Sequence, residues 1–244
     1  MDAIILAAGM GSRLGSLTRD KAKCLVEVGG MPIIDRVLRQ LKWLGVERLT
    51  LVVGYQAEGL MDHVLQCAER PAGIEFVRND IFAETNNMYS LWLAKDALCR
   101  TDVLLLESDL LLPDSVVRGL ADAPCANACL VAPYEPQMNG TVVQADGQGI
   151  ITRFIPRQFL RPEEAPTYLK TVNAYKLSRS FAQQCAERME EYLATVGRKD
   201  FYEVVFGQMV ADGQAQMLAV NVKEAKWHEV DTPEDLAAAE QMRL

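Results

Sequence analysis

Glycines and cations gather within the first 25 residues, directly after an apolar run. The run from Ala3 to Ala8 is followed by three closely spaced glycines, with Arg13 between them and Lys23 farther along. Glycine lets a backbone come close to a ligand, and successive N–H groups form a nest for an anion. Arginine and lysine add positive charge at fixed places. These residue types at this spacing predict a phosphate-binding loop.

Of two common kinds of glycine-rich loop, one is absent and the other is disfavoured. A Walker A loop requires G-x-x-x-x-G-K-[ST], which the chain lacks. A dinucleotide fingerprint requires a third glycine where Leu14 stands, and an acid at the end of the second strand, where Gly54 stands. A third pattern is L-A-A-G-x-G-[ST]-R-L followed farther on by a lysine. The stretch from Leu6 to Leu14, together with Lys23, matches it.

Two aspartates follow segments that are predicted to be strands. Asp109 follows residues 103–106, and Asp231 follows residues 227–230. Ligands of a doubly wound sheet bind at the carboxyl ends of its strands, and carboxylates suit Mg²⁺. Glu229 lies two residues before Asp231 and on the same side of a strand, so it is a candidate for the metal site or for a cationic substrate. The alternative role of Asp231 is to cap the last helix, although Thr232 is a better cap.

The glycine loop and the lysine resemble those of nucleotidyltransferases of the nucleoside-diphosphate-sugar pyrophosphorylase superfamily. The family usually has a proline where Ala22 stands and a basic residue where Met31 stands, but neither difference removes a catalytic charge. The resemblance implies that Arg13 binds the outer phosphates and that Lys23 stabilises charge at the α-phosphate. It also implies that Asp109 and Asp231 hold Mg²⁺. The implied nucleotide-binding residues of the loop are Leu6, Ala7, Ala8, Gly9, Met10, Gly11 and Ser12.

The stretch Thr-Asn-Asn-Met-Tyr-Ser-Leu at residues 85–91 favours one branch of that superfamily. Sugar-specific members usually carry Gln-x-Gly-Thr-Ala near this position. The segment is instead similar to the N-x-Y-S-L segment of cytidylyltransferases that act on phosphocholine and on 2-aminoethylphosphonate. The resemblance makes Asn86, Asn87 and Ser90 candidates for reading cytosine and ribose. Capping of the following helix is an equally good role for Asn86.

The acceptor in that branch has a phosphate or phosphonate at one end and an ammonium group at the other. We expect Lys170, Thr171 and Asn173 to bind the phosphorus oxygens. Candidates for the ammonium end are Tyr134, Tyr202, Glu203 and Glu229. A quaternary ammonium favours an aromatic box, whereas a primary amine favours carboxylates. Residues 201–203 lack a rich aromatic cluster, so 2-aminoethylphosphonate is favoured over phosphocholine, although Tyr202 has packing in the core as its alternative role.

The sequence therefore predicts a Mg²⁺-dependent enzyme that transfers CMP from CTP to a small phosphono- or phospho-amine and releases pyrophosphate. A second hypothesis is a sugar-1-phosphate nucleotidyltransferase, which the missing Gln-x-Gly segment disfavours. A third is a catalytically silent nucleotide-binding subunit, which the retention of both cations and both aspartates disfavours.

Strands and helices that alternate must position these residues. Strands are predicted at 3–8, 48–53, 74–77 and 103–106, with helices at 33–44, 60–68 and 88–98 between them. This alternation predicts an α/β fold with a doubly wound, mostly parallel, Rossmann-like (GT-A-like) sheet. Strands at 127–133, 141–145, 150–154 and 168–174 predict a small antiparallel extension in the second half. Further helices are expected at 178–196 and 200–211, strands at 215–220 and 227–230, and a last helix after Thr232.

We expect one nucleotidyltransferase domain over 1–244, with a nucleotide-binding half at 1–125 and an acceptor-binding half at 126–244. The net charge of −8 argues against nucleic acid and anionic membranes as partners. No apolar run is long enough for a membrane span or a signal peptide. The six cysteines show no metal-ligand spacing and favour free thiols in the cytoplasm. The sequence leaves the acceptor and the oligomeric state open, and a homo-oligomer is compatible with it.

Overall fold

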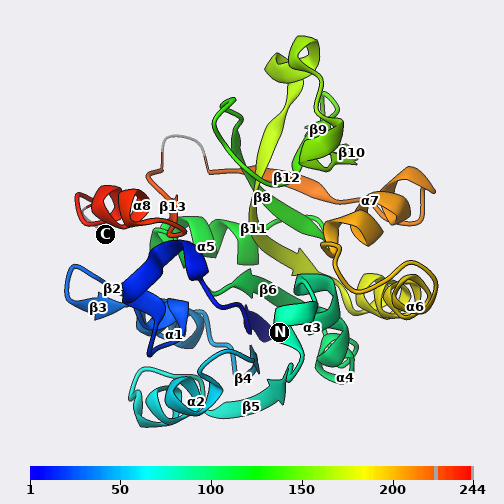
Figure 1. Ribbon diagram of the computed structural model, residues 1–244. Coiled ribbons are helices and arrows are strands. Elements are labelled where there is room, and N and C mark those ends of the chain that lie inside the picture. Colours follow the sequence, from blue (N-terminus) through cyan, green and yellow to red (C-terminus); the bar gives the residue numbers. More distant parts are fainter. Residues whose placement is uncertain (223–224, 243–244) are drawn as a thin grey trace.

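The computed structural model describes residues 1–222 and 225–242. Its centre is a nine-stranded sheet, in which four parallel strands lie in the order β5-β4-β1-β6 (Figure 1). These four strands are β1 (Asp2–Ala7), β4 (Arg48–Val53), β5 (Gly73–Arg78) and β6 (Val103–Glu107). Each agrees within about two residues with its expected position, as boundary rules allow. The parallel, α/β part of the fold prediction is confirmed.

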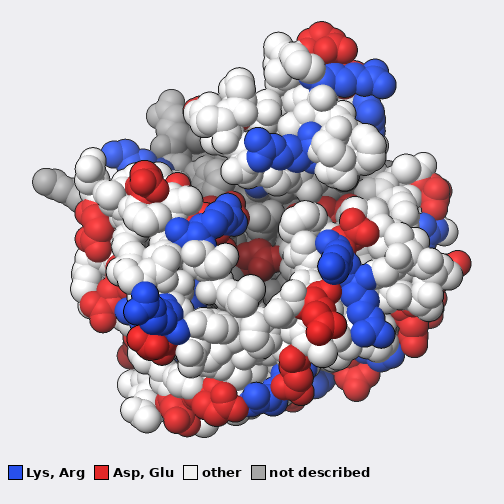
Figure 2. Space-filling view, viewed as in Figure 1, with Lys and Arg blue, Asp and Glu red and all other residues white. Residues whose placement is uncertain are grey.

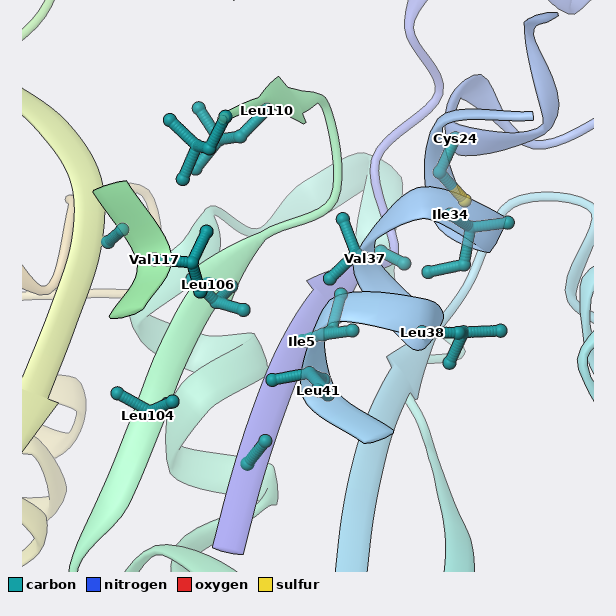
Figure 3. Close-up of a cluster of buried hydrophobic side chains, with 14 of the residues drawn as sticks. Ile5, Cys24, Ile34, Val37, Leu38, Leu41, Leu104, Leu106, Leu110 and Val117 are labelled. Atoms are coloured by element: carbon teal, nitrogen blue, oxygen red, sulfur yellow. The ribbon is translucent and has the colours of Figure 1, made fainter. Parts of the chain in front are cut away.

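Helices cover both faces of the sheet, because the central strands are apolar on both sides. One face carries α1 (Ile33–Trp43), α2 (Ala57–Gln66) and α5 (Asp114–Ala121). The other face carries α3 (Asn87–Leu93), α4 (Lys95–Leu98), α6 (Arg179–Thr195) and α7 (Glu203–Ala211). Figure 3 shows the first core, where Val37 and Leu41 of α1 approach Ile5 of β1. The strand ends are thereby held between two packed layers.

The antiparallel extension is also confirmed, and β11 (Leu169–Leu177) joins it to the parallel strands. The end of β11 pairs antiparallel with β6 and its start with β9, while β8 pairs with both the start and the end of β11. The remaining strands of the extension are β8 (Ala128–Pro133), β9 (Val142–Ala145), β10 (Ile151–Ile155) and β12 (Leu218–Asn221). In Figure 1, β9 and β10 rise above the main sheet.

The structure adds elements that the sequence analysis did not predict and divides one that it did. The helix expected over 88–98 is split at Ala94 into α3 and α4. The glycine loop leads into the 3₁₀ segments Ser12–Thr18 and Lys23–Leu25, which were not predicted, whereas α1 begins at Ile33 as expected. Helix α5 and the short strands β2 (Glu27–Val28), β3 (Met31–Pro32) and β7 (Leu110–Leu111) were also not predicted.

The last part of the chain returns to the end of β6. Strand β13 (His228–Glu229) pairs antiparallel with β7, and Val230 N donates to Asp109 O at 3.0 Å. Helix α8 (Pro233–Ala239) then begins with Thr232 as its cap, in a reciprocal capping box with Asp235. Asp231 lies between these two anchored elements. Among the described residues, no helix combines the length and the hydropathy that a membrane span requires.

Candidate active site

A cleft with a cavity volume of about 540 Å³ opens where β1 and β6 end and β11 begins. Figure 2 shows this hollow, with acidic atoms at its floor and basic atoms at its rim. Four cations line it, namely Arg13, Lys23, Arg157 and Lys170. Six carboxylates also line it, namely Glu107, Asp109, Asp200, Glu203, Glu229 and Asp231. The cleft therefore places both charge types within one cavity.

Lys23 meets both predicted aspartates. Its Nζ donates to Asp109 Oδ2 at 2.5 Å and also to Asp231 Oδ1. Arg13 forms an ion pair with the other oxygen of Asp231 at 2.8 Å, and its own side chain is 59% exposed. The glycine loop, the end of β6 and the C-terminal segment thus converge on one ammonium group, although 208 positions separate Lys23 from Asp231.

Lys23 keeps its charge in this setting. Burial on its own would lower the pKa of the Lys23 ammonium, but the adjacent carboxylates of Asp109 and Asp231 outweigh burial and raise that pKa. A permanent cation is the form needed to stabilise negative charge on phosphate oxygens.

The acids also fit a divalent cation. One oxygen each of Asp109, Glu229 and Asp231 can be chosen so that all lie within 4.8 Å of one another. Asp109 Oδ1 is buried and has no hydrogen-bond partner among the described residues, so it has a free lone pair for a metal. Burial, followed by the charge of Asp109, raises the pKa of Glu229 to about 7. Such crowding of carboxylates is relieved when a divalent cation neutralises them.

The glycine loop shapes the path of Lys23. Gly11 has φ +60°, and a Cβ there would lie 2.9 Å from Lys23 Cβ. A Cβ on Gly9 would meet nothing within 4 Å, so this glycine borders open space in the cleft. The other loop residues expected at the site also line the cleft, except Met10, whose side chain is 43% exposed and lies outside the lining.

Polar side chains around α3 form a second wall. Ser90 is buried, and its Oγ accepts from Asn79 Nδ2 at 3.0 Å. Asn86 and Asn87 also line the cleft, but their side chains bond within the protein, to Lys199 O and to Glu107 respectively. Asn86 is also the N-cap of α3, since its Oδ1 accepts from Asn87 N. Asn86 therefore caps α3, which was the alternative to its predicted role in reading cytosine and ribose.

The acceptor candidates divide into two groups. Lys170, Asn173, Glu203 and Glu229 line the cleft. Thr171 is fully buried and donates to Thr141 O, so it lies behind the lining. Tyr202 is also fully buried and packs edge-on against Tyr175, which is its alternative role of packing in the core. Tyr134 packs against Tyr168 in a separate cluster. These three side chains therefore have no direct access to an acceptor in this structure.

Glu203 stands out among the acids. It is 4% exposed, and Tyr175 Oη donates to its Oε1 at 3.3 Å. Its Oε2 has no hydrogen-bond partner among the described residues. Burial raises the pKa of Glu203, and the Lys170 ammonium opposes that rise. A buried carboxylate oxygen without a donor, at the wall of a cavity, is suited to a ligand that donates hydrogen bonds.

Sequence reasoning did not assign several lining residues to the site. Asn79 and Thr85 close the α3 wall, Glu107 adds a partly buried carboxyl at the end of β6, and Arg157 reaches the cleft from the extension. Glu107 follows the same strand as Asp109, two residues earlier, which is the signal for its position. Arg157 lies in a polar loop after β10, and only the pairing of β9, β10 and β11 brings that loop over the cleft.

Comparisons with known proteins show which of them are similar in sequence and fold. The family model for the MobA-like NTP transferase domain matches residues 3–211. The CMP-5'-(3-aminopropyl)phosphonate synthase of Streptomyces rubellomurinus is 35% identical over 98% of this chain, which spans only 38% of that protein. The 2-aminoethylphosphonate cytidylyltransferase of Lancefieldella rimae is 26% identical, over 97% of this chain and 91% of that protein.

A solved structure of CTP:phosphocholine cytidylyltransferase from Streptococcus pneumoniae has the same fold. Its TM-score is 0.80 at 19% identity, covering 98% of this chain and 97% of that chain. The resemblance to nucleotidyltransferases of the cytidylyltransferase branch is thereby confirmed. The match to the family model covers most of the chain, including the glycine loop, Lys23 and Asp109. The chain therefore belongs to the MobA-like NTP transferase family of nucleotidyltransferases.

Proposed function

We propose that the protein transfers CMP from CTP to a small phosphonate that carries a primary amine, and releases pyrophosphate. The observation that carries this proposal is the Lys23 ammonium held between Asp109 and Asp231 at the open side of the glycine loop. Relatives named for 3-aminopropylphosphonate and 2-aminoethylphosphonate support the acceptor class. As the acceptor, 2-aminoethylphosphonate is favoured over phosphocholine.

Lys23 and Arg13 supply the protein's positive charge in the proposed reaction. Lys23 leaves its two aspartates and donates to oxygens of the α-phosphate and of the incoming phosphonate. Arg13 is exposed at the rim, and its forked guanidinium suits the paired oxygens of the outer phosphates. Mg²⁺ bound by Asp109 and Asp231, with Glu229 beside them, would neutralise charge on the phosphate oxygens. Backbone N–H groups of the loop orient the triphosphate.

No general base is needed, because a phosphonate oxygen is already ionised at neutral pH. That oxygen attacks the α-phosphorus in line, the bond to the pyrophosphate oxygen breaks, and pyrophosphate leaves with the bonding electrons. Catalysis then consists of positioning and electrostatic stabilisation. We also propose that residues 1–125 bind the nucleotide and that residues 126–244 bind the acceptor, since Lys170 and Glu203 come from the second half.

The acceptor end of the cleft suits a primary amine. Lys170 is 3% exposed, and its Nζ donates to Thr171 O at 2.6 Å, which leaves further donor capacity for phosphonate oxygens. Glu203 offers an oxygen without a donor. The buried rings of Tyr175 and Tyr202 are packed against each other, and the aromatic residues that line the cleft are two phenylalanines, Phe82 and Phe201. Carboxylates rather than an aromatic box therefore face the ammonium group.

A panel of nucleotides and acceptors tests the proposal by release of pyrophosphate in the presence of Mg²⁺. We expect turnover with CTP and 2-aminoethylphosphonate or 3-aminopropylphosphonate, and weaker turnover with phosphocholine. Preference for a sugar 1-phosphate with UTP, GTP or dTTP would replace this function with the sugar-specific one. Binding of CTP without pyrophosphate release for any acceptor would indicate a silent nucleotide-binding subunit.

A further inference from the structure

The first turn of α3 holds the segment 198–202 against the cleft. Asn86 N donates to Arg198 O at 2.8 Å, and Asn86 Nδ2 donates to Lys199 O at 3.2 Å. The Arg198 guanidinium lies 5.2 Å from the centre of the Tyr89 ring. This set of contacts, which we call the α3 clasp, also includes Asn87 and its bond to Tyr202. It connects a wall of the nucleotide half to the start of α7 in the acceptor half.

Asn87 lies at the centre of the α3 clasp, and both ends of its amide are engaged. Its Nδ2 donates to Glu107 Oε1 at 3.0 Å. Its Oδ1 accepts from Tyr202 N at 3.1 Å, directly before Glu203, the first residue of α7. One side chain therefore fixes the carboxyl at the end of β6 and the backbone that carries the carboxyl at the start of α7. Both ends of this amide are therefore oriented by groups of the protein itself.

The two carboxyls that Asn87 fixes line the same cavity. Glu107 is partly buried and accepts from Asn87 itself, whereas Glu203 is buried and its Oε2 has no donor among the described residues. Two carboxyls at the wall of one cavity, one of them with an oxygen that lacks a donor, form a recess that favours a ligand with several N–H groups.

We propose that Asn87 is a positioning residue that sets Glu107 and Glu203 as the recess for the primary ammonium group of the acceptor, and does not itself read cytosine. This inference rests on the proposed function. A primary ammonium can donate three hydrogen bonds, whereas a quaternary ammonium can donate none. The geometry that Asn87 maintains therefore bears on recognition of the amine and not on the nucleotide.

An acceptor without the amine separates this role from a general structural one. Kinetics are measured for wild type and Asn87→Ala with 3-aminopropylphosphonate and with propylphosphonate, at saturating CTP. For the amine, we expect Asn87→Ala to raise KM by about 10-fold, as expected for loss of one polar contact. For propylphosphonate, kcat/KM should change by less than about 3-fold. The KM for CTP should likewise stay within about 3-fold of wild type.

Two further variants make the test decisive. Asn127→Ala is the matched control, because Asn127 also bridges two segments, accepting from Ser178 N at 2.8 Å and donating to Gln216 O at 3.1 Å, away from this cleft. It should show no amine-dependent loss. Asn87→Asp keeps the acceptor for Tyr202 N but removes the donor to Glu107, so it should show the same amine-dependent loss if Asn87→Ala does not fold.

The outcomes distinguish this inference from the proposed function. An equal loss for both acceptors, or a rise confined to the KM for CTP, would overturn the positioning role while leaving the proposed reaction intact. Failure of the wild-type protein to use any aminoalkylphosphonate would overturn the proposed function and this inference together.

Discussion

Lys23 has two roles, one in the folded protein and one in the proposed reaction. In this structure, it neutralises two aspartates that otherwise repel each other. In the proposed reaction, it transfers that positive charge to phosphate oxygens. A lysine suits both duties, because its single ammonium on a flexible stem can change partners, whereas a bidentate arginine is bound to one planar geometry.

Removal of Lys23 or Asp109 tests these duties. We expect Lys23→Ala and Asp109→Ala each to lower kcat at least ~100-fold, because each removes a group that stabilises transition-state charge. The measurement is steady-state release of pyrophosphate. Lys21→Ala is the control, since Lys21 lies two positions from Lys23 and outside the cleft lining. Near-normal turnover by either of the first two variants would remove that residue from catalysis.

Glu203 makes the stability of the ligand-free protein depend on pH. Burial raises its folded-state pKa above the ordinary value of 4.5, so the folded state binds more protons than the unfolded state above that pH. The free energy of unfolding therefore falls as pH rises through this window. Glu203→Gln removes the buried charge and should raise Tm at pH 8 by roughly 2–4 °C, or about 1 kcal/mol, with a smaller gain near pH 5.

Thermal unfolding at the two pH values measures this difference. The exposed Glu163 provides the control variant Glu163→Gln, which should leave Tm unchanged at both. A Tm for Glu203→Gln that stays below wild type at both pH values would mean that the carboxylate stabilises the ligand-free fold.

At the scale of elements, the glycine loop is built around a single close contact. Gly11 has φ +60°, which a residue with a Cβ adopts at a cost, and its Cβ would press on the stem of Lys23. We expect Gly11→Ala to cost about 1–2 kcal/mol of stability and to lower kcat by displacing Lys23. Gly9→Ala is the matched control: its Cβ enters open space, so Tm should hold while the KM for CTP rises. Equal Tm values for the two variants would contradict this account of the loop.

The junction of β13 and α8 fixes the second aspartate. Asp235 Oδ2 accepts from Asp231 N at 3.1 Å and from Thr232 N at 2.8 Å. Groups that orient a metal ligand typically affect metal affinity by about 10–100-fold. We expect Asp235→Ala to raise the Mg²⁺ concentration for half-maximal activity by about 10-fold or more. Glu234→Ala, in the same turn but exposed, should leave that concentration unchanged. Unchanged Mg²⁺ dependence in Asp235→Ala would show that Asp231 needs no such support.

The sequence predicts these elements well where neighbouring residues alone determine the structure. Asp109 could be placed at a strand end because the run before it is apolar, and the cap at Thr232, directly after Asp231, follows from Thr-Pro-Glu. The break at Ala94 was not predictable, because α3 and α4 share one continuous apolar pattern. Tyr202 and Thr171 were assigned to the acceptor pocket on residue type, whereas packing against Tyr175 and bonding to Thr141 place them behind it. Arg157 depends on strand pairing between distant segments, which no local pattern encodes.

At the scale of the whole molecule, the cleft lies where two halves of one continuous sheet meet. Strand β11 pairs with β6 at its end, with β9 at its start and with β8 at both, so the acceptor residues it carries belong to the same sheet as the parallel strands. The α3 clasp adds a second connection. Motion of one half relative to the other would have to break both sets of contacts.

This continuity predicts cooperative unfolding. We expect a single thermal transition by calorimetry, with equal calorimetric and van't Hoff enthalpies, as for one domain. Saturation with CTP and Mg²⁺ should raise the temperature of the entire transition. Ligand at 100 times its Kd adds about 2.7 kcal/mol to the free energy of unfolding. Two transitions, of which the ligand moves only one, would mean that residues 1–125 and 126–244 unfold separately.

The distance along the chain between Lys23 and Asp231 has a consequence for biosynthesis. The parallel strands, the loop and the first aspartate have all been translated long before the partner that lies 208 positions after the lysine. A nascent chain can thus build most of its sheet while the lysine still lacks one of its two carboxylates. A chain that stops just before Asp231 would lack the carboxylate that meets Lys23 and, under the proposed mechanism, a ligand for Mg²⁺.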